Sequence, residues 1–145
     1  MIFIVLLIGL CITVVLLCQA KTIVAKHVPT IVSNDSKFFK DYNIYRYANG
    51  LKPIVCEKLL NELAQEHADY LNEHKPKYLH DGFGDRELLA NAHAFAEVCE
   101  VRFISPLNAY LNSPKHKQIL DSQVYNYIGI GESGDYQCVM FARYD

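Results

Sequence analysis

The sequence lacks the features that mark several large classes of protein. Its 14 Lys and Arg residues face 16 Asp and Glu residues, and a net charge of −2 argues against a nucleic-acid-binding protein, which normally carries a basic excess. Only 7 Gly and 5 Pro occur among 145 residues, which excludes a collagen-like repeat. No two cysteines have the Cys-x-x-Cys spacing, so neither a zinc knuckle nor a thioredoxin-type redox pair is indicated. A hydrophobic content of 51% excludes a disordered chain.

The one long apolar run is at the N-terminus, which excludes a multi-span membrane protein. Residues 1–20 contain no Lys, Arg, Asp or Glu. Such a run is typical of a signal peptide, and the small residues Cys18 and Ala20 are suitable for cleavage after Ala20. The alternative is an uncleaved signal anchor, with Lys21 and Lys26 on its cytoplasmic side. Either way this segment takes no part in the fold; we expect a secreted protein or, alternatively, one anchored to a membrane only through residues 1–20.

The remainder of the sequence has the composition of an ordinary folded domain. About 46% of residues 21–145 are hydrophobic, which is within the range of about 45–50% for globular domains. Residues 21–33 contain Pro29 and show no clear period, so we expect them to form a leader. We expect residues 34–145 to form one domain, because domains usually contain about 100–150 residues.

Apolar spacing and capping residues predict helices followed by a terminal hairpin. Apolar residues from Cys56 to Leu71 recur at helical spacing, and Pro76 ends that helix. Because strands joined by a hairpin pair antiparallel, we expect an antiparallel sheet covered by helices, an α+β fold. The expected helices span 34–49, 56–75 and 86–95, with two short ones that begin at Pro106 and Pro114; the expected strands span 97–103, 124–131 and 136–144.

Three cysteines follow residue 20, namely Cys56, Cys99 and Cys138. They allow one disulfide and leave one thiol. Three pairings are possible, and the sequence does not distinguish between them.

Several short motifs occur in a fixed order between Asp41 and Phe141. They are Asn43-Ile44-Tyr45-Arg46, Gly50-Leu51-Lys52-Pro53, the helical series Leu60, Ala64 and Ala68, then His80, Ala96-Glu97-Val98, Tyr110-Leu111-Asn112-Ser113-Pro114-Lys115-His116 and Ile128-Gly129-Ile130-Gly131. In this order they resemble the CAP superfamily of cysteine-rich secretory proteins, antigen 5 and pathogenesis-related proteins, and its short microbial members in particular. The resemblance implies an α-β-α sandwich with a small antiparallel sheet flanked by helices.

The sequence departs from the family pattern at several of these positions. Ala96 and Val98 replace the glycine and asparagine beside the family glutamate, and Tyr110 replaces a tryptophan. Where many members have a second cavity glutamate, this chain has Asn112 and Ser113. The resemblance therefore implies a cleft with a single carboxylate.

The residues that the resemblance places in this cleft are His80, Glu97 and His116. Neutral imidazoles are natural zinc ligands, so His80 and His116 could bind zinc while Glu97 orients a metal-bound water. The alternative is that the histidines bond to Glu97 across a cleft that contains no metal. The resemblance implies a binding protein for a metal, lipid or protein ligand. The alternatives are a zinc-dependent hydrolase with Glu97 as general base and an interaction domain with a vestigial cleft.

Other residues whose side chains could in principle take part in catalysis are better explained by structural roles. His67 lies on the apolar stripe of its helix, where we expect a buried histidine bonded to a neighbour. Ser113 precedes Pro114 and is better explained as a helix cap than as a nucleophile. Glu100 is three residues from Glu97 along a strand, so the two carboxylates should face opposite sides and cannot form a catalytic pair.

Overall fold

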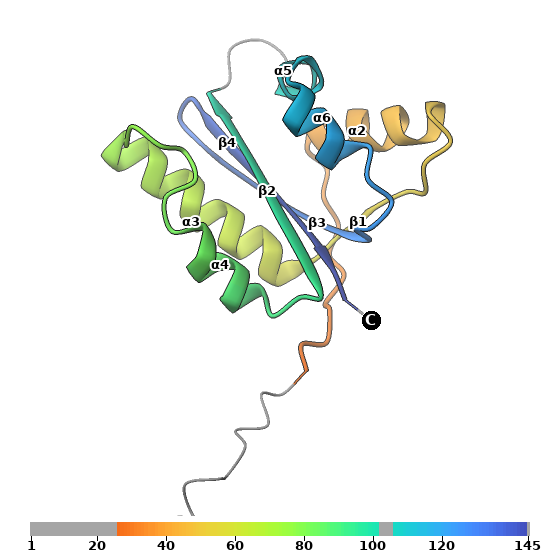
Figure 1. Ribbon diagram of the computed structural model, residues 1–145, viewed down its shortest axis with the longest axis horizontal. Coiled ribbons are helices and arrows are strands. Elements are labelled where there is room, and N and C mark those ends of the chain that lie inside the picture. Colours follow the sequence, from red (N-terminus) through yellow and green to blue (C-terminus); the bar gives the residue numbers. More distant parts are fainter. Residues whose placement is uncertain (1–25, 102–105, 145) are drawn as a thin grey trace, which may run out of the picture.

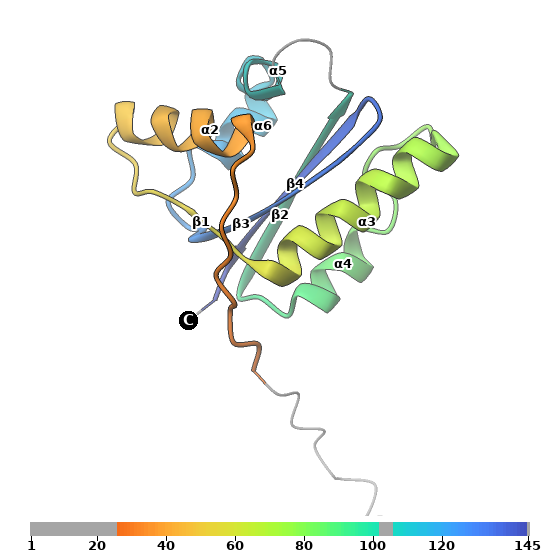
Figure 2. The ribbon, with the colours of Figure 1, turned by 180° about the vertical axis from the view of Figure 1, so that it is seen from behind.

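Two layers of helices enclose a four-stranded sheet in the part of the chain that the structure, a computed structural model, describes: residues 26–101 and 106–144. Helices α3 and α4 lie on one side of the sheet and helices α2, α5 and α6 on the other (Figures 1 and 2). The elements are α2 (Lys37–Ala48), β1 (Val55–Cys56), α3 (Lys58–His74), α4 (Phe83–Ala90), β2 (Ala94–Val101), α5 (Pro106–Asn112), α6 (Pro114–Leu120), β3 (Tyr127–Ser133) and β4 (Tyr136–Arg143). The expected α+β sandwich is confirmed.

The sheet has the strand order β1-β3-β4-β2. Strand β4 pairs antiparallel with β3, as the hairpin predicted, and also pairs antiparallel with β2. The two-residue strand β1, however, runs parallel to β3, with Val55 opposite Tyr127. The sheet is therefore mixed and not wholly antiparallel. The sequence pattern did not predict β1, because two residues carry no periodic signal, and it wrongly placed Cys56 in the helix that begins at Lys58.

The boundaries between α4 and β2 differ from those expected. The helix begins at Phe83 and ends at Ala90, where Asn91 adopts a left-handed conformation with φ of 48°. The expected helix over 86–95 is wrong in its last residues, because Ala94 and Phe95 already pair with β4. Strand pairing thus overrides the local helical preference of these residues. The expected strand end, 102–103, lies outside the described residues.

Two glycines allow α3 to lie directly on β3. A Cβ atom added at Gly129 would overlap the backbone of Leu60, and one added at Gly131 would overlap the backbone of Ala64. Any side chain at these positions would push the helix away from the strand. The closing Gly-x-Gly motif is therefore required for the contact between the helix and the sheet.

Polar side chains of α3 also cover the free edge of β3. Strand β1 pairs with β3 only at Tyr127 and Ile128, so the remainder of this edge needs other partners. Asn61 Oδ1 accepts a hydrogen bond from the backbone N–H of Ile130 at 2.9 Å, and Gln65 Nε2 donates to the backbone carbonyl of Glu132 at 2.9 Å.

Arg46 is buried and links α2 to the end of α6. Its Nε donates to the Lys52 carbonyl at 2.6 Å, and its Nη1 donates to the Tyr42 hydroxyl at 2.9 Å and to the Leu120 carbonyl at 3.1 Å. Five fixed donors suit arginine to a site where several carbonyls converge. This motif residue thus ties α2 to the turn that follows it and to the end of α6.

The other motif residues also have structural contacts. The Asn43 side chain bonds to both the N–H and the carbonyl of Ile54, at 3.0 and 3.2 Å. Tyr110 is buried, and its hydroxyl donates to the Gln137 carbonyl at 3.0 Å. Ser113 precedes α6 as expected, but its side chain makes no capping hydrogen bond.

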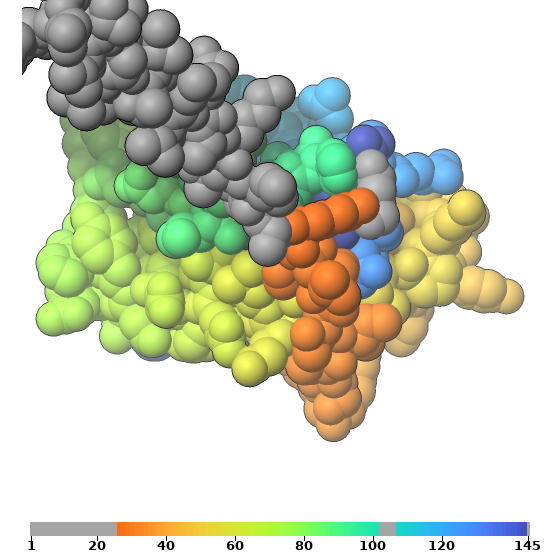
Figure 3. All heavy atoms as spheres, turned by 90° about the horizontal axis from the view of Figure 1, so that it is seen from below, coloured from red at the N-terminus to blue at the C-terminus, as the bar shows by residue number. Residues whose placement is uncertain are grey.

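The described part of the leader packs against the start of α3. Glu57 caps that helix by accepting from the N–H of Leu60 at 2.8 Å, and its other oxygen accepts from the N–H of Thr30 at 3.2 Å and lies 3.2 Å from His27 Nε2. In Figure 3 these leader residues, in orange, lie against the yellow atoms of this region. Within the described residues no helix is long and apolar enough to cross a membrane, and the predicted targeting segment, 1–20, lies outside them.

Candidate functional site

Glu97 is the centre of a buried cluster on the face of the sheet covered by α3 and α4. Arg86 binds the carboxylate with two hydrogen bonds, Nε to Oε2 at 2.6 Å and Nη2 to Oε1 at 2.7 Å. His80 Nδ1 donates to Oε1 at 2.9 Å. Arg86 is itself oriented by the Asp81 carbonyl, which accepts from Nη1 at 2.6 Å. Both oxygens of the carboxylate are therefore engaged.

His67 extends the same cluster from helix α3. As expected, it is buried and bonded to a neighbour, since its Nε2 donates to the Leu79 carbonyl at 2.7 Å. The same nitrogen lies 3.7 Å from Glu97 Oε1, so the ring also faces the carboxylate. Sequence analysis gave neither His67 nor Arg86 a place in the site. The only available signal was that His67 shares the sheet-facing stripe of α3, which is a weak one.

The electrostatics of the cluster favour an ionised carboxylate. Burial alone raises the pKa of Glu97, but the hydrogen bonds from His80 and Arg86 and the charge of Arg86 outweigh it, and the pKa is lowered from the ordinary 4.5. Burial lowers the pKa of His67 below its ordinary 6.5. At neutral pH the core of the cluster is therefore a Glu97–Arg86 ion pair beside a neutral His67.

His80 connects this cluster to solvent. Its side chain is 46% exposed, whereas the Glu97 side chain is fully buried. A carboxylate accepts only, so the contact with Glu97 places the proton on Nδ1. The lone pair of Nε2 then remains available to a ligand, which is how carboxylates commonly orient metal-binding histidines.

His116 approaches from the opposite helical layer. Its ring packs against Tyr110 with 5.5 Å between the ring centroids, and its buried Nδ1 has no hydrogen-bond partner among the described residues. Burial lowers the pKa of His116, the charge of Glu100 raises it and the charge of His80 lowers it again. Of the three predicted cleft residues, the structure places His80 and Glu97 in contact, whereas the ring contact of His116 is with Tyr110.

Each of the two predicted histidines has a nitrogen that could bind a metal, although among the described residues the group of possible ligand atoms within 4.8 Å of one another that contains His80 is completed by Glu97 and Cys99 and does not include His116. His80 offers an oriented Nε2, and the Nδ1 of His116 is a buried polar atom that lacks a partner. A nitrogen in that position is stabilised by a hydrogen-bond donor or a metal ion. Two imidazoles are suitable donors for zinc.

A cavity of about 380 Å³ lies between α3 and α4, beside the cluster. His67 and Arg86 form part of its lining, together with the carboxylates of Glu66, Asp81 and Asp85. Neither His80, Glu97 nor His116 lines it, so it is distinct from the predicted cleft.

Acid should destabilise the protein in two stages. Below pH 6.5 the unfolded chain protonates histidines that the fold keeps neutral, because burial lowers the pKa of His67 and of His116. Below pH 4.5 it also protonates Glu97 more readily than the folded chain does. We expect the urea midpoint to fall from pH 7 to 5 and again below 4.5. His67→Gln should reduce the slope of the first stage. A midpoint that is constant or rises on acidification from pH 7 to 5 would contradict this assignment.

Comparisons with known proteins address the fold. A family model described as CAP, cysteine-rich secretory protein family, matches residues 39–141. No curated protein sequence matches the chain. An extracellular SCP-domain protein from Bacillus anthracis has a similar structure, with a TM-score of 0.68, 20% identity, and coverage of 74% of this chain and 39% of that one.

Two further solved structures are similar. For an outer surface protein of Borrelia burgdorferi the TM-score is 0.66 at 20% identity, with 80% of this chain and 100% of that chain covered. For a cysteine-rich secretory protein of Staphylococcus aureus it is 0.64 at 19% identity, with 74% and 37% covered. The chain thus spans about two fifths of the Bacillus and Staphylococcus proteins.

Proposed function

The chain belongs to the cysteine-rich secretory protein (CAP) family, and from this premise we propose that it is an extracellular binding protein whose ligand site contains His80, Glu97 and His116. Two observations support the location: residues 1–20 are apolar, and the three similar structures are an extracellular, an outer surface and a secretory protein. Because one fold supports many functions, the choice of function depends on the site itself.

The observation that carries the proposal is the bidentate contact between Arg86 and Glu97. A general base works best when its pKa lies near the working pH. Both oxygens of Glu97 are engaged, and its pKa is lowered. This argues against the zinc-dependent hydrolase in which Glu97 acts as base, and supports Glu97 as a residue that positions His80.

We take a divalent transition metal, with zinc as its probe, as the ligand that the site fits best. His80 would bind through Nε2 and His116 through Nδ1, while Glu97 holds the His80 ring in place. Bound zinc supplies a Lewis acid with open positions, to which a further ligand group can bind. With two protein ligands we expect weak affinity, in the micromolar range.

Titration of zinc into the full, untagged chain, followed by calorimetry, tests this site. We expect binding that is lost in the His80→Ala/His116→Ala double variant and retained in His74→Ala. His74 is a suitable control because it is exposed and lies near the end of α3. Circular dichroism should show that all three proteins are folded.

Other outcomes distinguish the alternatives. No binding by the folded wild-type chain, or equal binding by the double variant, would refute the metal site and favour a vestigial cleft or a lipid or protein ligand. Metal-dependent turnover of a peptide substrate that is lost in Glu97→Gln, while circular dichroism shows this variant to be still folded, would support the hydrolase instead.

A further inference from the structure

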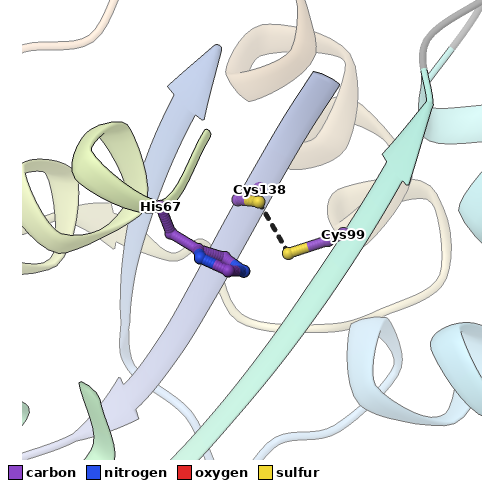
Figure 4. A group of neighbouring side chains, drawn as sticks. All are labelled: His67, Cys99 and Cys138. Carbon is purple, nitrogen blue, oxygen red and sulfur yellow. Dashed lines mark hydrogen bonds between the residues drawn. The ribbon is translucent and has the colours of Figure 1, made fainter. Parts of the chain in front are cut away.

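Cys99 and Cys138 lie beside each other in the sheet. They are directly opposite partners in the antiparallel pairing of β2 with β4. Their sulfur atoms are 2.6 Å apart, and both residues are buried, with 2% and 0% of their surface exposed. Figure 4 shows the two side chains pointing toward each other across the strands, next to the ring of His67.

The backbone at this pair is already suitable for a disulfide. Directly opposite residues of an antiparallel pair have Cα atoms about 4.5–5.5 Å apart. Disulfides bridge Cα atoms that are about 4.4–6.8 Å apart. The bond therefore needs no rearrangement of β2 or β4.

The third cysteine belongs to a different part of the core. Cys56 packs in a hydrophobic cluster with Ile128 and Val98, whereas Cys99 and Cys138 pack in a separate cluster with Ala68 and Leu71 of α3. Neighbouring residues of β2 face opposite sides of the sheet, so Val98 and Cys99 lie on different faces. A disulfide from Cys56 to Cys99 or to Cys138 would have to cross the sheet.

A metal site is the competing explanation, because one ligand atom each of His67, Cys99 and Cys138 lie within 4.8 Å of one another. Two thiolates bound to one tetrahedral zinc are about 3.8 Å apart. At 2.6 Å the sulfur atoms are too close for that arrangement. His67 Nε2 is, in addition, bonded to the Leu79 carbonyl.

We propose that Cys99 and Cys138 form a disulfide that joins β2 to β4, and that Cys56 remains the one buried thiol of the three. The bond forms by exchange with an oxidised dithiol carrier. Each cysteine gives up its thiol proton, an S–S bond forms between the two sulfur atoms, and the two electrons reduce the disulfide of the carrier to two thiols. This requires only the extracellular location and is independent of the ligand proposal.

The timing of this reaction follows from the burial of the pair. Exchange needs a thiolate, and burial strongly raises the pKa of the Cys99 thiol, with the neighbouring Cys138 raising it further. Exchange must therefore precede the packing of α3 over the strands, and the completed bond is shielded from reductants. Because Glu97 lies two residues before Cys99 on the same face of β2, the bond also restrains the strand that carries the carboxylate.

Peptide mapping of the full chain, exported through an oxidising compartment, tests the proposal. After denaturation and alkylation without reductant, we expect alkylated Cys56 and one linked species that contains the peptides of Cys99 and Cys138, separable by dithiothreitol. Folded protein should keep the link in dithiothreitol unless denaturant is added. Free Cys99 and Cys138, a link from either one to any other cysteine, or a metal retained by both thiolates would overturn the proposal.

Thermal unfolding provides a second measurement. The link closes a loop with ends 39 positions apart, so Cys99→Ala/Cys138→Ala should lower Tm by an amount on the order of 10 °C. Under the same oxidising conditions Cys56→Ala should keep the link, and dithiothreitol with denaturant should release it. If the double variant and the wild-type chain unfold at the same temperature, no bond stabilises the native protein.

Discussion

Replacing Glu97 by Gln should lower the free energy of unfolding by about 3–5 kcal/mol. The substitution leaves the Arg86 guanidinium largely buried and without its carboxylate. An unpaired buried charge costs much more than the intact pair contributes, because the surrounding protein solvates it poorly. Urea unfolding at pH 7, monitored by circular dichroism, measures the loss.

Two variants show whether the lost charge pairing is the cause. Glu100→Gln removes a carboxylate from the same strand but from its other face, and should change the stability by less than about 0.5 kcal/mol. In Glu97→Gln/Arg86→Met the unpaired charge is gone, so the double variant should lose less than the sum of the two single variants. A Glu97→Gln protein within about 1 kcal/mol of the wild-type chain would show that the pair is not needed for folding.

Gly131→Ala should destabilise the protein by about 3 kcal/mol or more. The new methyl group would overlap the backbone of Ala64 in α3. No rotamer change can relieve an overlap with backbone atoms, so the helix must move away from β3. That movement would stretch the Gln65–Glu132 contacts, which include the hydrogen bond at 2.9 Å. The free energy of unfolding in urea measures the effect.

The same substitution elsewhere provides the control. Gly84 lies in α4, and a Cβ atom added there would meet nothing within 4 Å. Gly84→Ala should therefore stabilise the protein, by about 0.5–1 kcal/mol, because alanine favours the helix. If Gly131→Ala and Gly84→Ala have similar stability, then the contact of α3 with β3 does not depend on Gly131.

Much of the fold follows from local patterns in the sequence. The apolar spacing from Leu60 to Leu71 predicted α3, the residues around Gly134 predicted the hairpin, and the order of short motifs indicated the CAP family. The same order indicated His80 and Glu97 as candidates for one cleft, and the structure places these two side chains in hydrogen-bond contact. These properties depend on residues that are close in sequence or on a recurring order of motifs.

The tertiary structure alone decided how distant residues pair. The parallel strand β1, the choice of Arg86 as partner for Glu97 and the contact of Cys99 with Cys138 each depend on which positions become neighbours after folding. The spacing of residues along the sequence does not predict such neighbours, because they are set by strand register and by the packing of α3 and α4 on the sheet. The sequence by itself therefore determined the fold class and the candidates His80 and Glu97, whereas the register and packing of the sheet decided how the Glu97 carboxylate is held and which two cysteines meet.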